Sequence, residues 1–362
     1  MIPDLRAIVP AGGAGTRLWP LSRAGSPKFL HDLTGTGRTL LQATVDRLLP
    51  LTGPDGVVVV TGRRHLDAVR AQLDLGAEAV FGEPSPKDSM AAIGLAAAVL
   101  AERDPDVVVG SFAADHVISG DGFADAVRQA VAVAREGLLV TVGIAATEPS
   151  TAFGYVRSGE PLEVPGAPSA RRVRGFTEKP DAGTAAAYLA TGEYRWNAGM
   201  FVVRARVLLD HLARLNPPLH DGLRAIAAAW DSDARSAALE RHWPGLPAIA
   251  IDRAIAEPVA AEGGVATVPG DFAWHDIGDF ASLAGQLPVG PSGARVLGTA
   301  EVLALDADGA LVVTGGRVVA VLGIDDVVVV DTPDALLVTT RGHAQQLKSV
   351  VDLVRERRAD LL

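Results

Sequence analysis

The segment PAGGAGTRLWP, from Pro10 to Pro20, places three glycines and Arg17 directly after an apolar stretch, and Lys28 follows in the segment SPKFL. Glycine in such a place costs stability unless the backbone turns sharply or a ligand comes close. Bare backbone N–H groups can surround a phosphate, and the positive end of a following helix adds to the attraction. Arg17 offers a planar fork of donors and Lys28 a compact charge, so both suit an anion. The loop therefore predicts a phosphate site, although taken alone it is also compatible with a simple turn beside solvated cations.

Three known glycine-loop motifs can be compared with these residues. The P-loop ends in Gly-Lys-Ser/Thr, whereas Gly15 is followed by Thr16 and Arg17. The dinucleotide motif G-x-G-x-x-G fits at Gly13 and Gly15 but has Leu18 where its third glycine belongs. The third motif, Gly-Gly-x-Gly-Thr-Arg-Leu followed by Pro-Lys, is matched at every position.

The composition limits the classes of partner. The chain has 362 residues, of which 48% are hydrophobic and 21% charged, and its formal net charge is -10. The protein as a whole therefore repels nucleic acid and anionic membranes. Cysteine is absent, which excludes disulfides, thiolate metal sites and thiol nucleophiles. No secretory signal or membrane span is recognisable, so we expect a cytoplasmic protein.

Apolar, strand-like segments alternate with helical patterns through the first half of the chain, as in RAIVPA, GVVVVTG, DVVVGSFAAD and LLVTVGI. Strands that are apolar on both faces indicate a mainly parallel sheet covered by helices. The predicted fold class is α/β, with a doubly wound, Rossmann-like domain over residues 1–287 that carries an insertion at about 147–205. A Pro/Gly-rich linker follows. Residues 288–362 are expected to form a small β-rich domain that ends in a helix.

Local signals add further expectations. Pro50 should end the helix TLLQATVDRLLP, and Ser89 is a candidate N-cap for the alanine-rich helix after it. Asp181 and Asp279 also suit helix N-caps. The pair Asp308-Gly309 is a hairpin signal. Asp115 closes a buried segment at the strand end where open α/β sheets bind their ligands.

The third glycine motif is the signature of the sugar nucleotidyltransferases, and with Trp19 to Arg23 the chain most resembles the mannose-1-phosphate guanylyltransferases, or GDP-mannose pyrophosphorylases. The resemblance continues in order through GEPSPKDSMAAIGLAA, AADHVI, FGYVRSG, FTEKPD, WNAGMFV, IDRAIAEP and WHDIGDFASL. The valine-rich end resembles the short β-helix-like tail of single-function members. Bifunctional members continue into a sugar-isomerase barrel, which this chain is not expected to hold.

The resemblance implies that the phosphate of mannose 1-phosphate attacks the α-phosphorus of GTP in line, giving GDP-mannose and pyrophosphate. The attacking phosphate is largely ionised near neutrality, because its second pKa is about 6, so no side-chain base is required. Such a site must instead bring two anions together and neutralise charge on the pyrophosphate. GTP and mannose 1-phosphate are thus the expected substrates and Mg²⁺ the expected cofactor; a homodimer is left open.

Residue roles also follow from the resemblance. Arg17, Lys28, Asp115 and Asp276 are implied to be catalytic, with Asp115 and Asp276 holding Mg²⁺ against the phosphates. The implied nucleotide contacts are Ala11, Gly12, Gly13, Gly15, Thr16, Arg17, Lys28, Glu83 and Lys87. The implied sugar-phosphate contacts are Gly154, Glu178, Lys179 and Asn197, with Glu178 accepting from a hydroxyl and Lys179 contacting the phosphate.

One block departs from the family. Its commoner form reads Arg-Asn-Thr where this chain has Lys87, Asp88 and Ser89, which leaves contacts to the base and triphosphate open.

Three alternatives remain: the same reaction with another nucleotide or sugar 1-phosphate, a non-catalytic homologue that binds sugar nucleotide to regulate a partner, and a nicotinamide dehydrogenase. The last is disfavoured by Leu18.

Overall fold

The computed structural model describes residues 1–13 and 15–362, which form two compact units. Unit 1 comprises Met1–Ala11, Val45–Ala113 and Ile118–Trp274. Unit 2 comprises Gly12–Thr44, Ala114–Val117 and His275–Leu362. Packing thus groups the glycine loop with the C-terminal residues. The domain boundary expected after residue 287 divides the chain into two consecutive segments, which the two units do not test, so it stays a prediction.

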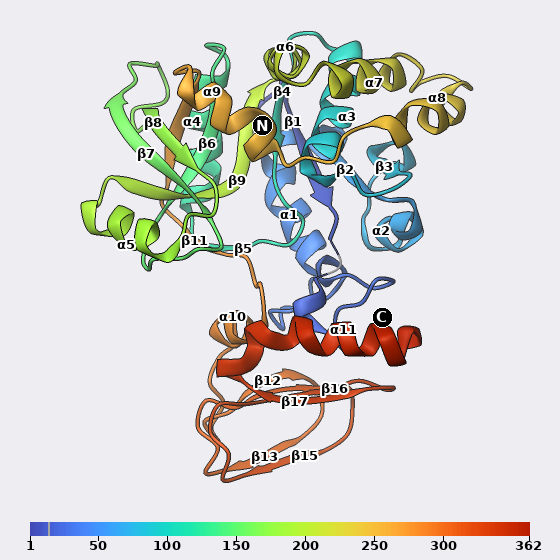
Figure 1. The fold of residues 1–362 in the computed structure, drawn as a ribbon, viewed down its shortest axis with the longest axis vertical. Helices are drawn as coiled ribbons and strands as arrows, with labels where there is room; N and C mark the ends of the chain where they lie inside the picture. Colours follow the sequence, from blue (N-terminus) through green and yellow to red (C-terminus); the bar gives the residue numbers. More distant parts are fainter. Residues whose placement is uncertain (14) are drawn as a thin grey trace. The chain divides into compact units, whose positions relative to one another are not determined.

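A mixed sheet forms the centre of unit 1, with the strand order β3-β2-β1-β4-β9-β6-β10-β8-β7 among the described residues (Figure 1). Its strands are β1 (Leu5–Ala11), β2 (Val57–Gly62), β3 (Val80–Glu83), β4 (Val108–Ser111), β6 (Leu139–Ala145), β7 (Gly154–Pro161), β8 (Arg171–Thr177), β9 (Tyr194–Arg204) and β10 (Val265–Gly270). β1 pairs in parallel with β2 and β4, β2 with β3, and β6 with β10. The antiparallel partners, β7, β8 and β9, come from the expected insertion. The predicted α/β class is confirmed.

Helices cover this sheet because its strands are apolar on both faces. In β2, Val57 to Val60 are all buried. α3 packs on β1 and β2 and against α6 and α7, and α4 packs on β6, β9 and β10. The helices of this part are α1 (Leu40–Thr52), α2 (Leu66–Gln72), α3 (Asp88–Arg103), α4 (Gly122–Ala134), α5 (Ala182–Thr191), α6 (Ala205–Leu215), α7 (Pro217–Ala228), α8 (Arg235–His242) and α9 (Glu257–Ala261). Two short strands, β5 (Val117–Ser119) and β11 (Ala273–His275), pair separately.

Two helix boundaries differ from expectation. α1 continues through Pro50 to Thr52, because proline removes its own intrahelical hydrogen bond but leaves those of later residues, such as Gly53 N–H to the Leu49 oxygen at 2.8 Å. Gly53, with φ of 75°, ends it instead. α3 begins at Asp88, and Ser89 does not cap it. The Ser89 hydroxyl instead accepts a hydrogen bond from the backbone N–H of Ile251 at 2.9 Å.

The C-terminal part of unit 2 is β-rich and ends in a helix, as predicted. Its elements are α10 (Phe280–Gln286), β12 (Arg295–Gly298), β13 (Val302–Leu305), β14 (Leu311–Thr314), β15 (Val319–Leu322), β16 (Val327–Asp331), β17 (Leu336–Thr340) and α11 (Leu347–Arg357). β12, β14 and β16 pair in parallel and β17 joins them antiparallel, while β13 pairs in parallel with β15. The hairpin expected at Asp308-Gly309 is therefore wrong. The turn joins β13 to β14, which lie in different sheets. A turn sequence reverses the direction of the chain but does not determine which strands pair with each other.

The residues after the glycine loop pack into this part of unit 2. Leu18 and Trp19 share a core with Phe280 of α10 and with Leu347 and Val351 of α11. α11 lies along the four-stranded sheet, whose buried side chains join the same core (Figure 1). The indole N–H of Trp19 donates to the backbone oxygen of Leu361 at 2.9 Å. The glycine loop is thus anchored to the C-terminal end of the chain.

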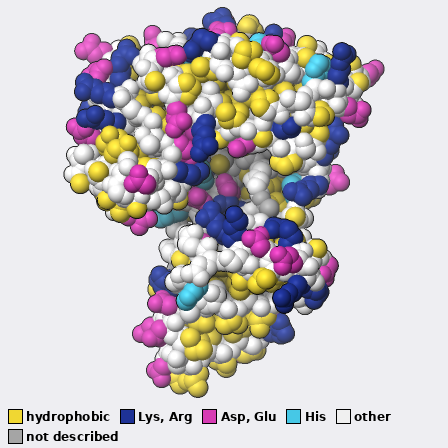
Figure 2. All heavy atoms as spheres, in the orientation of Figure 1, with side chains coloured by type: hydrophobic (Ala, Val, Ile, Leu, Met, Phe, Trp, Pro, Cys, Tyr) yellow, Lys and Arg dark blue, Asp and Glu magenta, His cyan; other side chains and the backbone are white. Residues whose placement is uncertain are grey.

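Apolar side chains also gather on the surface of the C-terminal strands (Figure 2). The exposed members are Leu303, Leu305, Val318, Leu322, Ile324, Leu336 and Val338. Within residues 1–13 and 15–362, no helix is long and apolar enough to cross a membrane.

Candidate active site

Three of the predicted catalytic residues meet in unit 2. The ammonium nitrogen of Lys28 lies 2.8 Å from Asp115 Oδ2 and 3.3 Å from Asp276 Oδ1. It also donates to the backbone oxygen of Asp276 at 2.8 Å. The Lys28 side chain is 11% exposed, whereas those of Asp115 and Asp276 are 24% and 34% exposed. The two carboxylate side chains are therefore more accessible to a ligand or an ion than the Lys28 side chain.

The glycines of the loop have two different tasks. A Cβ on Gly12 or Gly13 would meet no atom within 4 Å, so their backbone is open to a ligand. Gly15 has φ of 59°, and a Cβ there would lie 3.1 Å from Lys28 Cβ and 2.9 Å from Ser22 Oγ. Gly15 therefore makes room for the lysine stem. After it comes only a three-residue 3-10 turn, Thr16–Leu18, instead of a long helix, so a phosphate would depend on backbone amides and side-chain cations.

Arg17 is exposed and is held from the C-terminal side of the sequence. Its Nη1 lies 3.4 Å from Gln345 Oε1, and the Gln345 amide donates to the carboxylate of Asp279. Asp279 also caps α10, accepting from the Ser282 N–H at 2.8 Å in a reciprocal capping box. A Cβ on Gly278 would lie within 4 Å of both Arg17 and Asp276. Arg17 and the Lys28 cluster therefore border the same backbone segment.

Electrostatics keep Asp115 and Lys28 of this cluster ionised. Burial alone would raise the pKa of Asp115, but the nearby charges of Lys28 and His116 hold that pKa below its usual range. Burial alone would lower the pKa of Lys28, but the two carboxylates raise it. Two carboxylates and one ammonium leave a net negative charge, which favours a further cation.

A magnesium ion fits the donors at this place. Asp115 and Asp276 each place a carboxylate oxygen next to the ammonium group of Lys28. Mg²⁺ prefers hard oxygen ligands such as these. Across the part of the chain that the structure describes, no cluster of three or more His, Cys, Asp or Glu could hold a metal. Phosphate oxygens and water would have to complete the coordination.

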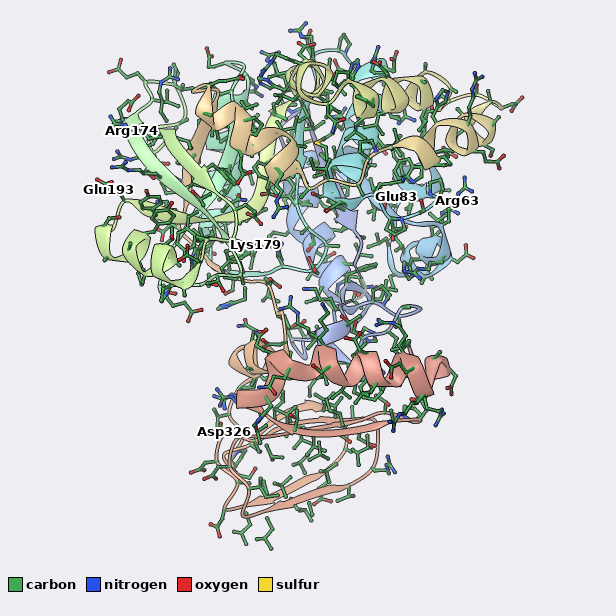
Figure 3. All side chains as sticks on the ribbon, viewed as in Figure 1. Arg63, Glu83, Arg174, Lys179, Glu193 and Asp326 are labelled. Atoms are coloured by element: carbon green, nitrogen blue, oxygen red, sulfur yellow. The ribbon has the colours of Figure 1, made fainter. Side chains whose placement is uncertain are left out.

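Other predicted nucleotide residues belong to unit 1. Glu83 ends β3, is 8% exposed and has one buried oxygen, Oε1, without a hydrogen-bond partner among the described residues (Figure 3). Burial raises its pKa to about 7. The Lys87 ammonium donates to the backbone oxygen of Pro244 at 2.8 Å. Ala11 is buried at the end of β1, where its carbonyl accepts from the Thr61 hydroxyl at 2.8 Å.

The departure at Asp88 has a backbone explanation. Its φ is 64°, in the left-handed region, and its carboxylate accepts from the Ser89 N–H at 2.7 Å. Asp and Asn tolerate that region better than most residues. An aspartate can therefore hold the same backbone shape as the asparagine of the commoner form.

The four predicted sugar residues also meet in unit 1. Gly154 and Asn197 are opposite each other in the ladder between β7 and β9. A Cβ on Gly154 would overlap Glu178 Oε2 and lie 3.3 Å from Asn197 Cβ. Lys179 (Figure 3) forms an ion pair with Glu178 at 3.0 Å. Gly154 thus leaves space that the Glu178 carboxylate occupies.

Sequence reasoning missed Asp252 and Glu257, which belong to the same group. Asn197 Nδ2 donates to Asp252 Oδ1 at 2.7 Å, and Asn197 Oδ1 accepts from the Thr141 hydroxyl at 2.7 Å. Glu257 accepts from the Glu178 N–H at 3.1 Å. Burial, reinforced by the charge of Glu178, raises the pKa of Asp252 to about 6. The available signal was the pair of acids, Asp252 and Glu257, in the block IDRAIAEP. Asp252 begins a π-helical turn, a feature frequent at functional sites.

Comparison with known proteins places this geometry in context. The family described as "Nucleotidyl transferase" matches residues 6–287, and "MannoseP isomerase/GMP-like beta-helix domain" matches residues 300–353. The Xanthan biosynthesis protein XanB of Xanthomonas campestris pv. campestris is 35% identical over 97% of this chain and 73% of its own. Mannose-1-phosphate guanylyltransferase of Escherichia coli K12 is also 35% identical, with the same coverage. A crystal structure described as mannose-1-phosphate geranyltransferase from Thermus thermophilus superposes with a TM-score of 0.86 at 31% identity, covering 97% of this chain and 99% of that one.

Replacing Glu83 by glutamine should change how stability depends on pH. The pKa of Glu83 is about 7 in the folded protein against an ordinary value of 4.5. Folding therefore favours the neutral form of Glu83. The stability that this group contributes is full below its ordinary pKa of 4.5 and is lost as the pH rises through its folded pKa of about 7. The advantage of E83Q in unfolding free energy should grow from near zero at about pH 4.5 to about 3 kcal/mol above about pH 7.5. Urea unfolding across this range measures it.

The matched control is E136Q, because Glu136 is an exposed glutamate in the same unit. Its curve should run parallel to that of the unchanged protein. A parallel curve for E83Q as well would show that burial does not perturb Glu83.

Proposed function

The chain belongs to the nucleotidyl transferase family, and we propose that it transfers GMP from GTP to α-D-mannose 1-phosphate, giving GDP-mannose and pyrophosphate, with Mg²⁺ as cofactor. Action in the cytoplasm is part of the same proposal. The observation that carries it is the placement of Lys28 between Asp115 and Asp276. A regulatory homologue without activity would have no need to keep this cation between two accessible carboxylates.

The chemistry needs one bond to form and one to break. A phosphate oxygen of the sugar phosphate attacks the α-phosphorus of GTP, and the bond from that phosphorus to the bridging oxygen breaks, so that pyrophosphate leaves with the electron pair. No proton has to be removed from the attacking oxygen. Arg17 and Lys28 would hold phosphate oxygens, and the open backbone of Gly12 and Gly13 would lie against the triphosphate.

Asp115 and Asp276 would hold Mg²⁺ when it is bound, and the ion would supply positive charge to the triphosphate and the departing pyrophosphate. Lys28 holds the two carboxylates close together and keeps Asp115 ionised before any ligand arrives. Its second task is therefore to limit the repulsion between them.

The predicted sugar residues in unit 1, together with Asp252, supply acceptors for sugar hydroxyls. Glu178 and Asp252 are carboxylates, and Asn197 fixes Asp252 through its amide. Because the Asn197 amide oxygen is already occupied by the Thr141 hydroxyl, its orientation is determined. Lys179, exposed beside Glu178, is the cation proposed to meet the sugar phosphate.

Pyrophosphate release with mannose 1-phosphate and Mg²⁺ tests the proposal directly. We expect kcat/KM with GTP to exceed that with ATP, UTP or dTTP by at least about tenfold, because a base pocket that pairs polar groups discriminates strongly. A different preferred nucleotide would correct the base and leave the mechanism in place. No release with any of the four, in folded protein, would contradict the catalytic proposal.

Replacing Lys28 by alanine should lower kcat/KM for the nucleotide by about 10²- to 10³-fold, as loss of a preorganised charge contact does. The effect on the KM for GTP should exceed that on the KM for mannose 1-phosphate. K348A is the matched control, because Lys348 is an exposed lysine of the same unit. Equal kinetics for K28A and K348A would remove Lys28 from the site.

Replacing Gly154 by alanine should displace the Glu178 carboxylate, because the new Cβ would overlap Glu178 Oε2. Loss of one hydroxyl contact of about 1.4 kcal/mol raises the KM for mannose 1-phosphate about tenfold and leaves that for GTP within about twofold. G245A serves as control, since a Cβ there meets no atom within 4 Å. If G154A changes only the KM for GTP, Glu178 does not bind the sugar.

A further inference from the structure

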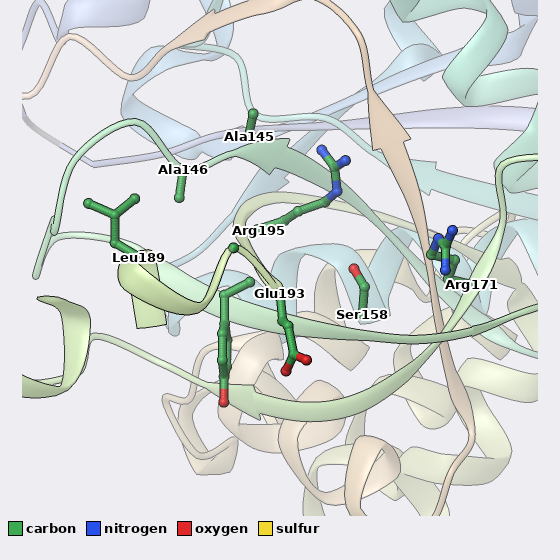
Figure 4. A pocket seen from close by; sticks show the side chains of 9 residues that line it. Ala145, Ala146, Ser158, Arg171, Leu189, Glu193 and Arg195 are labelled. Atoms are coloured by element: carbon green, nitrogen blue, oxygen red, sulfur yellow. The ribbon is translucent and has the colours of Figure 1, made fainter. Parts of the chain in front are cut away.

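A polar cavity lies in unit 1, and none of the residues that line it is among those proposed for the reaction. It has a volume of about 430 Å³ and is formed by the end of β6, by β7, β8, the end of α5 and the start of β9 (Figure 4). Ser158 of β7, Arg171 of β8 and Arg195 of β9 line it, together with Leu189 and Tyr194. The volume falls within the usual range for small-molecule sites.

Two arginines of this cavity have no acidic partner among the described residues. Neither Arg171 nor Arg195 forms a salt bridge with any of them; Arg171 donates only to the backbone oxygen of Gly159, at 3.1 Å. Burial and the charge of Arg171 hold the pKa of Arg195 below its usual range. Two like charges thus face a common space without compensation, and an anion between them would remove the repulsion.

Neighbouring cations are compensated, which sets the two arginines apart. Arg157 pairs with Glu193 at 2.7 Å. Arg172 and Arg174 both reach Glu160, at 3.8 Å and 3.1 Å. Glu193 is the one carboxylate among the described residues that line the cavity, so its charge is already balanced from outside. The cavity as a whole is therefore positive.

A hydroxyl group lies in the same space. Ser158 Oγ is buried and has no hydrogen-bond partner among the described residues. The ladder between β7 and β8 shifts its register on both sides of Ser158, and such irregularities re-aim side chains. A buried hydroxyl without a partner costs free energy that a ligand acceptor would recover.

We propose that this cavity binds the phosphate group of a small phosphomonoester, with Arg171 and Arg195 on the phosphate oxygens and Ser158 donating its hydroxyl. A dianion matches two guanidinium groups, whose planar forks bind phosphate through paired hydrogen bonds. A monoanionic carboxylate would leave one positive charge uncompensated. Leu189 and Tyr194 provide an apolar wall for the organic part. The site is additional to the proposed reaction and does not depend on it.

The test uses the full chain and phenyl phosphate, titrated calorimetrically at constant ionic strength, with phenyl sulfate as a monoanionic comparison and inorganic phosphate as the group without its organic part. R171Q and R195Q should each weaken phenyl phosphate binding at this site at least tenfold. R174Q, which removes a paired arginine of the same strand, should bind like the unchanged protein. Phenyl phosphate should bind more tightly than phenyl sulfate.

Equal affinity in all four proteins would overturn the proposal, and so would an equal loss in R174Q, which would indicate general electrostatic attraction. Arg171 is exposed, so R171Q is expected to fold even if the half-buried Arg195 does not tolerate replacement. Pyrophosphate release by R171Q without phenyl phosphate should be unchanged. Binding is read without turnover, so failure of the proposed reaction and failure of this site give different results.

Discussion

The ammonium group of Lys28 lies 2.8 Å from Asp115 and 3.3 Å from Asp276, and each of the three segments that make up unit 2 contributes one of these residues. A half-buried charge is costly without a partner, so each carboxylate depends on the lysine and the lysine on both. Gly15 leaves room for the lysine stem. The same interaction that joins the three segments therefore also concentrates charge at the proposed triphosphate site.

Unit 1 uses buried acids in a different way. Glu83 and Asp252 have no cation among the described residues as close as Lys28 is to Asp115, and burial raises their pKa values to about 7 and about 6. Asp252 is instead held by the neutral amide of Asn197. Carboxyl groups with weak compensation are suited to hydroxyl and N–H donors, whereas Asp115 and Asp276, which share the ammonium of Lys28, are the residues proposed to hold a metal ion. The Arg171 and Arg195 cavity is the opposite case, with cations that lack an anion.

Much of the fold could be predicted from local patterns. The apolar runs of β1, β2, β4 and β6 and their alternation with helices indicated an α/β fold with parallel pairing, which holds for β1 with β2 and β4, while the insertion makes the sheet mixed. Asp181 and Asp279 do cap their helices. Predictions failed where the residue or strand that carries a local signal forms its hydrogen bonds with a distant part of the chain. Ser89 bonds to Ile251 instead of capping α3, and the turn at Asp308 serves strands whose partners lie elsewhere.

The sequence by itself determined the glycine loop, the family resemblance and the types of residue at the candidate site, because these depend on which residues occur and in what order. Only the tertiary structure decided that Lys28 lies between two aspartates, that Asn197 holds Asp252, and that Arg171 and Arg195 share a cavity without an acid. Charge interactions and burial vary with distance and with access to water. Both are determined by contacts between residues far apart in the chain, and no local pattern encodes them.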